Sequence, residues 1–153
     1  MDLKTMYSPS EPCSCETCVS YCKRPGWWTP EEAEKAIECG FAGRMMLEIA
    51  PEFNFAVLSP AFKGNELQYS SRVFADNGCT FLMNKRCELF NTGFQPLECR
   101  FCHHKRQGQG KMCHHDIEIL WNTEKAKRII VRWGNNTGFW LKQGLDVHER
   151  KRS

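Results

Sequence analysis

The stretch CSCETCVSYC, residues 13–22, places four cysteines within ten positions, and the rest of the chain is interpreted from it. Cysteines at this density indicate either a bound metal or a disulfide framework. Cys15 and Cys18 are separated by two residues, a spacing that lets two thiolates bind one metal through a tight turn. Cys22 follows one turn later. The stretch therefore predicts that the fold is built around a thiol-rich site.

A second group of cysteines lies in the second half of the chain, interleaved with the histidine pairs at 103–104 and 114–115. Ten cysteines in all are too many for one four-coordinate ion, so we expect one larger cluster, two sites, or several core cysteines. Free cysteine is often buried, and we expect this of the isolated Cys39. The expected metal ligands are Cys15, Cys18, Cys22, Cys79, Cys87, Cys99 and Cys102.

Several other residues of these two groups have a less defined role. Cys13, Cys39, Cys113 and the histidine pairs are left open as ligands. We expect the paired histidines to be solvated loop residues, and the alternative is a second metal site indicated by the repeated Cys-His-His pattern. Arg100 follows Cys99 directly. A cation at this place lowers the cost of the negative charge that thiolates bring, so Arg100 is the expected cofactor-binding residue.

Bulk composition favours metal over disulfides. The chain has 153 residues, 41% of them hydrophobic and 25% charged, which fits one globular domain. The beginning of the sequence has no apolar segment typical of a secretory signal, and no stretch is long and apolar enough for a membrane helix. We therefore expect a cytoplasmic protein, in which thiols stay reduced. The net charge of +3 is too small to argue for nucleic acid.

The expected fold is a small, mostly helical α+β domain with a short β-hairpin, cross-linked by a cysteine metal site. We divide the chain into a flexible leader (1–12), a cysteine-cluster metal-binding domain (13–145) and a basic flexible tail (146–153). Two helices have clear start signals: one follows Thr29, with a capping box completed by Glu32, and the other follows Thr123.

Weaker patterns predict the remaining elements. We expect a short helix over 43–49, a strand over 54–58, a short strand over 72–75 and a mobile loop over 103–111. The segment 79–90 predicts a hairpin that turns at Asn84-Lys85.

Residues 79–100 also contain an ordered set of motifs: Cys-Thr-Phe-Leu, then Arg-Cys-Glu-Leu-Phe, then Gln-Pro-Leu-Glu-Cys-Arg. After an N-terminal cysteine cluster, this order resembles the YkgJ-like cysteine-cluster family, described as zinc- or iron-chelating proteins. The resemblance covers roughly residues 13–104. It implies that Cys79, Cys87, Cys99 and Arg100 occupy motif positions of that family. The adjacent cysteine pair of the family is absent here, because residues 19–21 separate Cys18 from Cys22.

The implied cofactor is an iron–sulfur cluster (4Fe-4S) or a zinc ion. Thiolate-only sites suit both. Three close cysteines with one remote cysteine are a common iron–sulfur arrangement, whereas a histidine ligand would favour zinc.

Three functions fit this sequence. The first is a metal-binding protein in a redox, metal-handling or accessory role. The second is an enzyme of modification or redox type with the cluster beside a substrate pocket, since the methylase of flagellin lysines carries a similar cysteine cluster. The third is a zinc module that binds nucleic acid. No catalytic motif is present, so enzyme activity stays open. The expected partner is the metal ion or cluster; a protein partner stays open, and neither nucleic acid nor a membrane is expected.

Overall fold

Thr29 begins helix α3 (Pro30–Ala36) as the sequence predicts. The Thr29 hydroxyl accepts the Glu32 N–H at 3.1 Å, and the Glu32 carboxylate accepts the Thr29 N–H at 3.0 Å. Both donors would otherwise be unpaired at the start of the helix. The helix ends in a π-helical turn (Ile37–Phe41), where Gly40 adopts a φ of 95° that glycine tolerates without strain.

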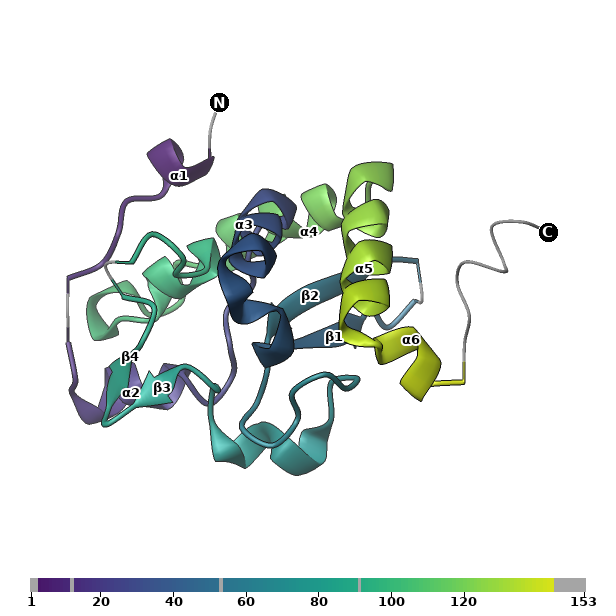
Figure 1. Ribbon diagram of the computed structural model, residues 1–153. Helices are drawn as coiled ribbons and strands as arrows, with labels where there is room; N and C mark the ends of the chain where they lie inside the picture. The colour runs from purple at the N-terminus through teal and green to yellow at the C-terminus, as the bar shows by residue number, and fades with distance from the viewer. Residues whose placement is uncertain (1–2, 12, 53, 91, 145–153) are drawn as a thin grey trace.

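The structure is a computed structural model that describes residues 3–11, 13–52, 54–90 and 92–144, so the predicted tail at 146–153 lies outside it. It confirms a small, mostly helical α+β fold with short antiparallel strands (Figure 1). Besides α3, the helices are α1 (Leu3–Met6), α2 (Glu16–Tyr21), α4 (Lys111–Trp121), α5 (Glu124–Thr137) and α6 (Phe139–Lys142). The strands are β1 (Met45–Ile49), β2 (Ala56–Pro60), β3 (Leu82–Met83) and β4 (Arg86–Cys87).

Strands β1 and β2 form an antiparallel pair that runs from Met45 opposite Pro60 to Ile49 opposite Ala56. Helices α3 and α5 contact β2, and Figure 1 shows α3, α4 and α5 above this pair of strands. The core between them is rich in large side chains, which stabilise the fold mainly through the apolar area that they remove from water. The largest fully buried side chains include Trp28, Trp121, Trp133, Phe81, Phe139, Met45, Met46 and Leu58.

Each fully buried tryptophan finds a partner for its indole N–H. Trp28 donates to the Phe94 carbonyl at 2.7 Å, and Trp121 donates to the Trp28 carbonyl at the same distance. Trp133 donates to the Ala42 carbonyl at 2.9 Å. Because an unpaired buried donor is costly, these bonds fix the three indoles against the backbone at Trp28, Ala42 and Phe94.

The predicted helix over 43–49 is wrong. Residues Ala42–Arg44 form a single 3₁₀ turn, η2, and Met45–Ile49 is strand β1. Met45, Met46 and Leu47 are consecutive and all buried, a pattern that periodicity cannot distinguish from a helix. The distant segment 56–60 supplies the partner strand, and this pairing overrides the helical preference of methionine and leucine.

The predicted strand at 72–75 is also wrong, because Arg72–Asn77 forms the 3₁₀ helix η3. The Ser71 hydroxyl accepts the Val73 N–H at 3.3 Å and so favours a helical start. The sequence analysis also missed α4, although Cys113, Ile117 and Trp121 lie four residues apart and are its buried face. The segment 103–111 contains a further 3₁₀ turn, η5 (His104–Arg106), rather than loop alone.

The hairpin and the α5 start are confirmed. Strands β3 and β4 pair antiparallel around Asn84 and Lys85, which both have positive φ (50° and 66°) as tight hairpin turns require. The Thr123 hydroxyl accepts the Ala126 N–H at 3.2 Å and caps α5. In Figure 1 the β3–β4 hairpin lies beside α2, at the end of the molecule opposite α6. A backbone hydrogen bond of 2.7 Å from Cys79 to Cys22 joins the two regions.

Candidate metal centre

Three cysteines and one histidine converge next to α2. Their ligand atoms, the Sγ of Cys13, Cys15 and Cys18 and a ring nitrogen of His104, all lie within 4.8 Å of one another. His104 Nδ1 lies 3.6 Å from Cys13 Sγ, 3.5 Å from Cys15 Sγ and 3.2 Å from Cys18 Sγ. We call these four residues the Cys₃His centre.

Helix α2 positions two of the thiols. Cys15 caps the helix and its Sγ accepts the Cys18 N–H at 3.5 Å. Cys18 lies one turn later and is buried, and its Sγ accepts the His104 N–H at 3.2 Å. Backbone amides directed at sulfur stabilise the thiolate form, which is the form that binds metal.

The two thiols of α2 differ in acidity. The hydrogen bond from the Cys18 amide, with further bonds from the neighbouring thiols, lowers the pKa of Cys15 to about 7. Burial raises the pKa of Cys18 to about 11, against the opposing effect of the His104 amide. Cys15 therefore offers a thiolate near neutral pH, and a metal bound by the centre would displace the protons of the other thiols.

Hydrogen bonds from Arg100 and Arg106 hold the N-terminal segment that leads into the centre. The Arg106 guanidinium donates to the Ser8 carbonyl at 2.6 Å and to the Pro9 carbonyl at 3.2 Å. The Arg100 guanidinium donates to the Tyr7 carbonyl, and the Tyr7 hydroxyl donates to Asp116 at 2.7 Å. These contacts bring the beginning of the chain to the segment that carries His104.

The geometry suits one four-coordinate ion. With ligand bonds of about 2.3 Å to sulfur and 2.0 Å to nitrogen, tetrahedral zinc places each sulfur about 3.5 Å from the nitrogen. The three sulfur–nitrogen distances, 3.2 to 3.6 Å, match this value. The Cys₃His centre can therefore hold a metal ion.

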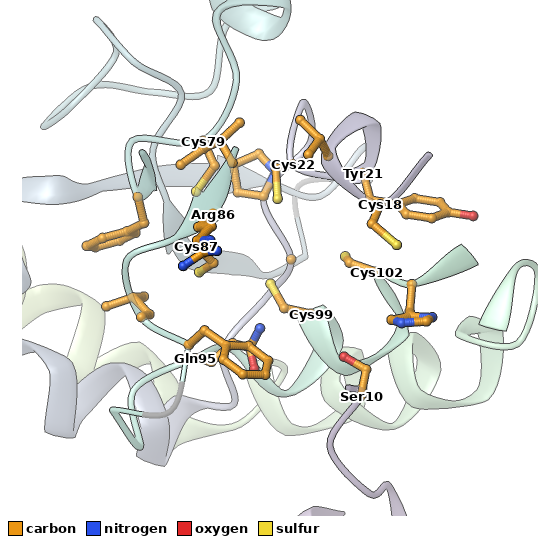
Figure 2. Close-up of a pocket in the computed structure, with 18 of the residues that line it drawn as sticks. Ser10, Cys18, Tyr21, Cys22, Cys79, Arg86, Cys87, Gln95, Cys99 and Cys102 are labelled. Atoms are coloured by element: carbon orange, nitrogen blue, oxygen red, sulfur yellow. The ribbon is translucent and has the colours of Figure 1, made fainter. Parts of the chain in front are cut away.

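A second set of thiols surrounds a cavity of about 620 Å³ next to the Cys₃His centre (Figure 2). Figure 2 shows their side chains arranged around one open space. Cys13 and Cys18 also line it, so the two regions share a wall. We call this space the thiol cavity, and its five other cysteines are Cys22, Cys79, Cys87, Cys99 and Cys102.

The elements around the thiol cavity are held close together. Cys22 ends α2, Cys87 lies in β4, and Cys99 lies in the 3₁₀ helix η4 (Leu97–Phe101). The backbone of Cys79 is held by an isolated antiparallel β-bridge to Phe62. Gly26 packs so tightly below η4 that a Cβ atom there would lie 2.6 Å from Cys99 Sγ.

The thiols of the cavity are mostly protonated in the absence of metal. Burial raises the pKa of both Cys22 and Cys79 to about 12, and it raises the pKa of Cys87 as well. A hydrogen bond between Cys99 and Cys102 raises the pKa of Cys99 and lowers the pKa of Cys102. A cation bound here would remove the main cost of ionising these groups, because its charge offsets the buried thiolates.

The structure divides the seven predicted ligands between two places. Cys15 and Cys18 lie in the Cys₃His centre, and the other five line the thiol cavity. Arg100 is not among the residues that line the cavity in the described part of the chain, and its guanidinium donates to the Tyr7 carbonyl. Its role as a cofactor-binding residue stays a prediction.

The sequence left both Cys13 and His104 open as ligands, and both belong to the Cys₃His centre. The repeated Cys-His-His pattern was the available signal, but it could not indicate which histidine of a pair turns toward the thiols. The expectation that Cys39 is buried is wrong, because this thiol is exposed. Cys113 is fully buried in the core.

Of the other paired histidines, His115 is exposed as expected, whereas His103 and His114 are not simply solvated. His103 is buried, stacks on the His104 ring at 4.4 Å and accepts the Lys105 N–H at 3.1 Å. His114 Nδ1 lies 2.6 Å from a Glu98 oxygen, and its ring packs 4.3 Å from the Trp27 ring. His103 therefore supports the orientation of the ligand His104, and His114 fixes η4 against α4.

Comparison with known proteins returned no match among protein-family models, curated proteins or solved structures. None of the helices in the described residues is long and apolar enough to cross a membrane. The function is therefore inferred from the Cys₃His centre and the thiol cavity.

Proposed function

We propose that this chain is a metal-binding protein whose Cys₃His centre holds one zinc ion. The observation that carries the proposal is the convergence of Cys13, Cys15, Cys18 and His104 within 4.8 Å. Three thiolates and one imidazole are a common ligand set for structural zinc. A protein ligand fills each of the four positions, so the zinc has no open position for a substrate and acts structurally.

The zinc proposal is tested by metal analysis of the purified protein and two variants. Cys18→Ser removes the buried thiol and His104→Ala removes the nitrogen ligand, so each should lower the zinc content by about one ion per chain. Cys39→Ser is the matched control, because Cys39 is an exposed thiol outside both sites. Unchanged zinc in both ligand variants, or an equal loss in the control, contradicts the proposal.

A second metal group is proposed for the thiol cavity, and an iron–sulfur cluster fits it better than a single ion. Thiolates around tetrahedral zinc lie about 3.8 Å apart. Among the described residues, the five thiols of the cavity contain no group of three within 4.8 Å comparable to the Cys₃His centre. A cluster of several irons spreads its cysteine ligands over separate metal atoms, and four cysteines suffice to hold it.

Anaerobic purification with a visible spectrum and analysis of iron and sulfide tests the cluster. We expect a brown protein that loses iron in Cys79→Ser and Cys99→Ser but keeps its zinc. The Cys39→Ser control should retain both metals. A colourless protein that contains zinc alone, with no iron after anaerobic reconstitution, contradicts the cluster.

These centres support a redox, metal-handling or accessory role in a reducing compartment such as the cytoplasm, where free thiols persist. The order of motifs at 79–100 is the basis for proposing membership of the YkgJ-like cysteine-cluster family. The nucleic-acid alternative has less support. Arg106 donates to backbone carbonyls of the N-terminal segment, and Lys105 lies 3.9 Å from Glu11, so these cations already have partners within the chain.

A further inference from the structure

The thiol cavity is larger than a metal group needs. Its volume of about 620 Å³ lies within the usual range of small-molecule pockets, roughly 300 to 1,000 Å³. A metal bound by thiolates lies about 2.3 Å from each sulfur, so it stays beside the sulfur atoms that bind it. Cys79 is buried and the other four cavity thiols are half-buried.

Cations line the mouth of the cavity. Arg24, Lys85 and Arg86 contribute to its lining while their side chains remain exposed, which places them where the cavity meets solvent. Figure 2 shows Arg86 next to Cys87. The acidic residue that also lines the cavity, Glu11, lies 3.9 Å from Lys105 and is partly neutralised by it. The mouth is therefore electropositive.

Two of these cations belong to the β3–β4 hairpin. Lys85 and Arg86 lie at its tight turn, where Asn84 and Lys85 both adopt positive φ. Within the described part of the chain, neither side chain forms an ion pair or a hydrogen bond. A guanidinium and an ammonium that line the same cavity suit a carboxylate or a phosphate.

The lining of the cavity also includes apolar and aromatic side chains. Tyr21, Leu82, Phe90 and Pro96 contribute to it, and Gln95 adds a polar amide. Pockets of this kind bind the body of a ligand through apolar contacts and orient it through a few polar groups. The volume argues for a small molecule rather than a macromolecule.

We propose that the thiol cavity binds a small organic anion, with its carboxylate or phosphate at Lys85 and Arg86 and its apolar body directed toward the metal group. This inference rests on the proposed function, because it assumes that the cysteines of the cavity hold a metal group. It gives the enzyme alternative a substrate class: small, anionic and partly apolar.

Isothermal titration calorimetry of the metal-loaded protein tests the inference with three probes. Phenyl phosphate and benzoate each carry one of the two anionic groups on a benzene ring. Benzyl alcohol, which has the same ring and no charge, is the neutral control. We expect at least one anion to bind and the alcohol not to bind. Arg86→Gln should weaken the binding of that anion about tenfold, the usual effect of losing one hydrogen bond to a charged group.

Arg128→Gln is the matched control, because Arg128 is an exposed cation on α5 that does not line the cavity. It should leave anion binding unchanged. The inference is overturned if neither anion binds, if the alcohol binds equally well, or if both arginine variants weaken binding alike. It is also overturned if Arg86→Gln loses metal, since Arg86 would then serve the metal group itself.

Metal content, measured before each titration, distinguishes failure of the proposed function from failure of this inference. A wild-type chain without zinc or iron contradicts the proposed function and this inference together. A fully metal-loaded chain that binds neither anion contradicts only the inference.

Discussion

Cys99 packs against Gly26, which has no Cβ atom and so leaves room for the Cys99 side chain. A Cβ at this position would lie 2.6 Å from Cys99 Sγ and 2.9 Å from the Cys99 backbone nitrogen. The nitrogen belongs to η4 and cannot move without displacing that helix. The small size of residue 26 is therefore a condition for the geometry of the thiol cavity.

We expect Gly26→Ala to lower the free energy of unfolding by about 1–3 kcal/mol through overpacking. The same variant should lose metal from the thiol cavity, because Cys99 is displaced. Urea denaturation and metal analysis measure the two effects. Gly43→Ala is the control, since a Cβ there meets nothing within 4 Å. Equal stability of the two variants would show that Cys99 is not constrained by residue 26.

Cys113 gives the folded protein a defined dependence on alkaline pH. Burial raises the pKa of its thiol from about 9 to about 12. The folded state therefore holds this proton more tightly than the unfolded state. The stability contributed by the neutral thiol is fully present below pH about 9 and is lost as pH rises toward 12.

The free energy of unfolding should fall more steeply with pH in the wild type than in Cys113→Ala, over pH values of about 8 to 10. Urea midpoints at several pH values measure the two slopes. Cys39→Ala should follow the wild-type slope, because Cys39 is exposed. Parallel curves for the wild type and Cys113→Ala would refute the prediction.

At the scale of elements, α5 and α6 meet through a contact that also depends on a glycine. A Cβ on Gly134, in the last turn of α5, would overlap the indole of Trp140 in α6. That indole donates to the Val131 carbonyl at 3.1 Å. Gly134 thus lets α6 fold back onto α5.

Gly134→Ala places two effects in opposition. Alanine favours a helix over glycine by about 1 kcal/mol, whereas overpacking costs about 1–3 kcal/mol. We expect net destabilisation, with a change in tryptophan fluorescence as Trp140 is displaced. Thermal unfolding measures the sign. Asn136→Ala, on an exposed position of the same helix, should be neutral or stabilising, and a stabilised Gly134→Ala would contradict this packing.

The elements also show where sequence patterns fail. Helices α3 and α5 follow from Thr29 and Thr123, since a cap and an apolar stripe are local properties. Strand β1 does not follow from its own residues, because Met45–Leu47 suits a helix or a buried strand equally. Its state depends on β2, which pairs with it from 56–60.

At the scale of the whole molecule, the Cys₃His centre joins parts of the chain that are far apart in sequence. Cys18 and His104 are separated by 86 positions. Metal that binds only the folded chain contributes its binding energy to folding.

Removal of the metal with a chelator should therefore lower Tm by about 5 °C or more. Scanning calorimetry before and after chelation measures the change, and added zinc should restore the original value. The Cys18→Ser variant, without a complete centre, should show a smaller shift. An unchanged wild-type Tm after verified metal loss would contradict a stabilising role.

Local patterns in the sequence predict a thiol-rich site and the elements with clear start or turn signals. The clustered cysteines, the capped helices α3 and α5 and the tight turn at Asn84-Lys85 can be found in this way, because each depends on residues within a few positions of one another. The packing of the folded chain divides the thiols between the Cys₃His centre and the thiol cavity. It also selected His104, since which side chains meet across 86 positions depends on how the core packs and not on their spacing in the chain.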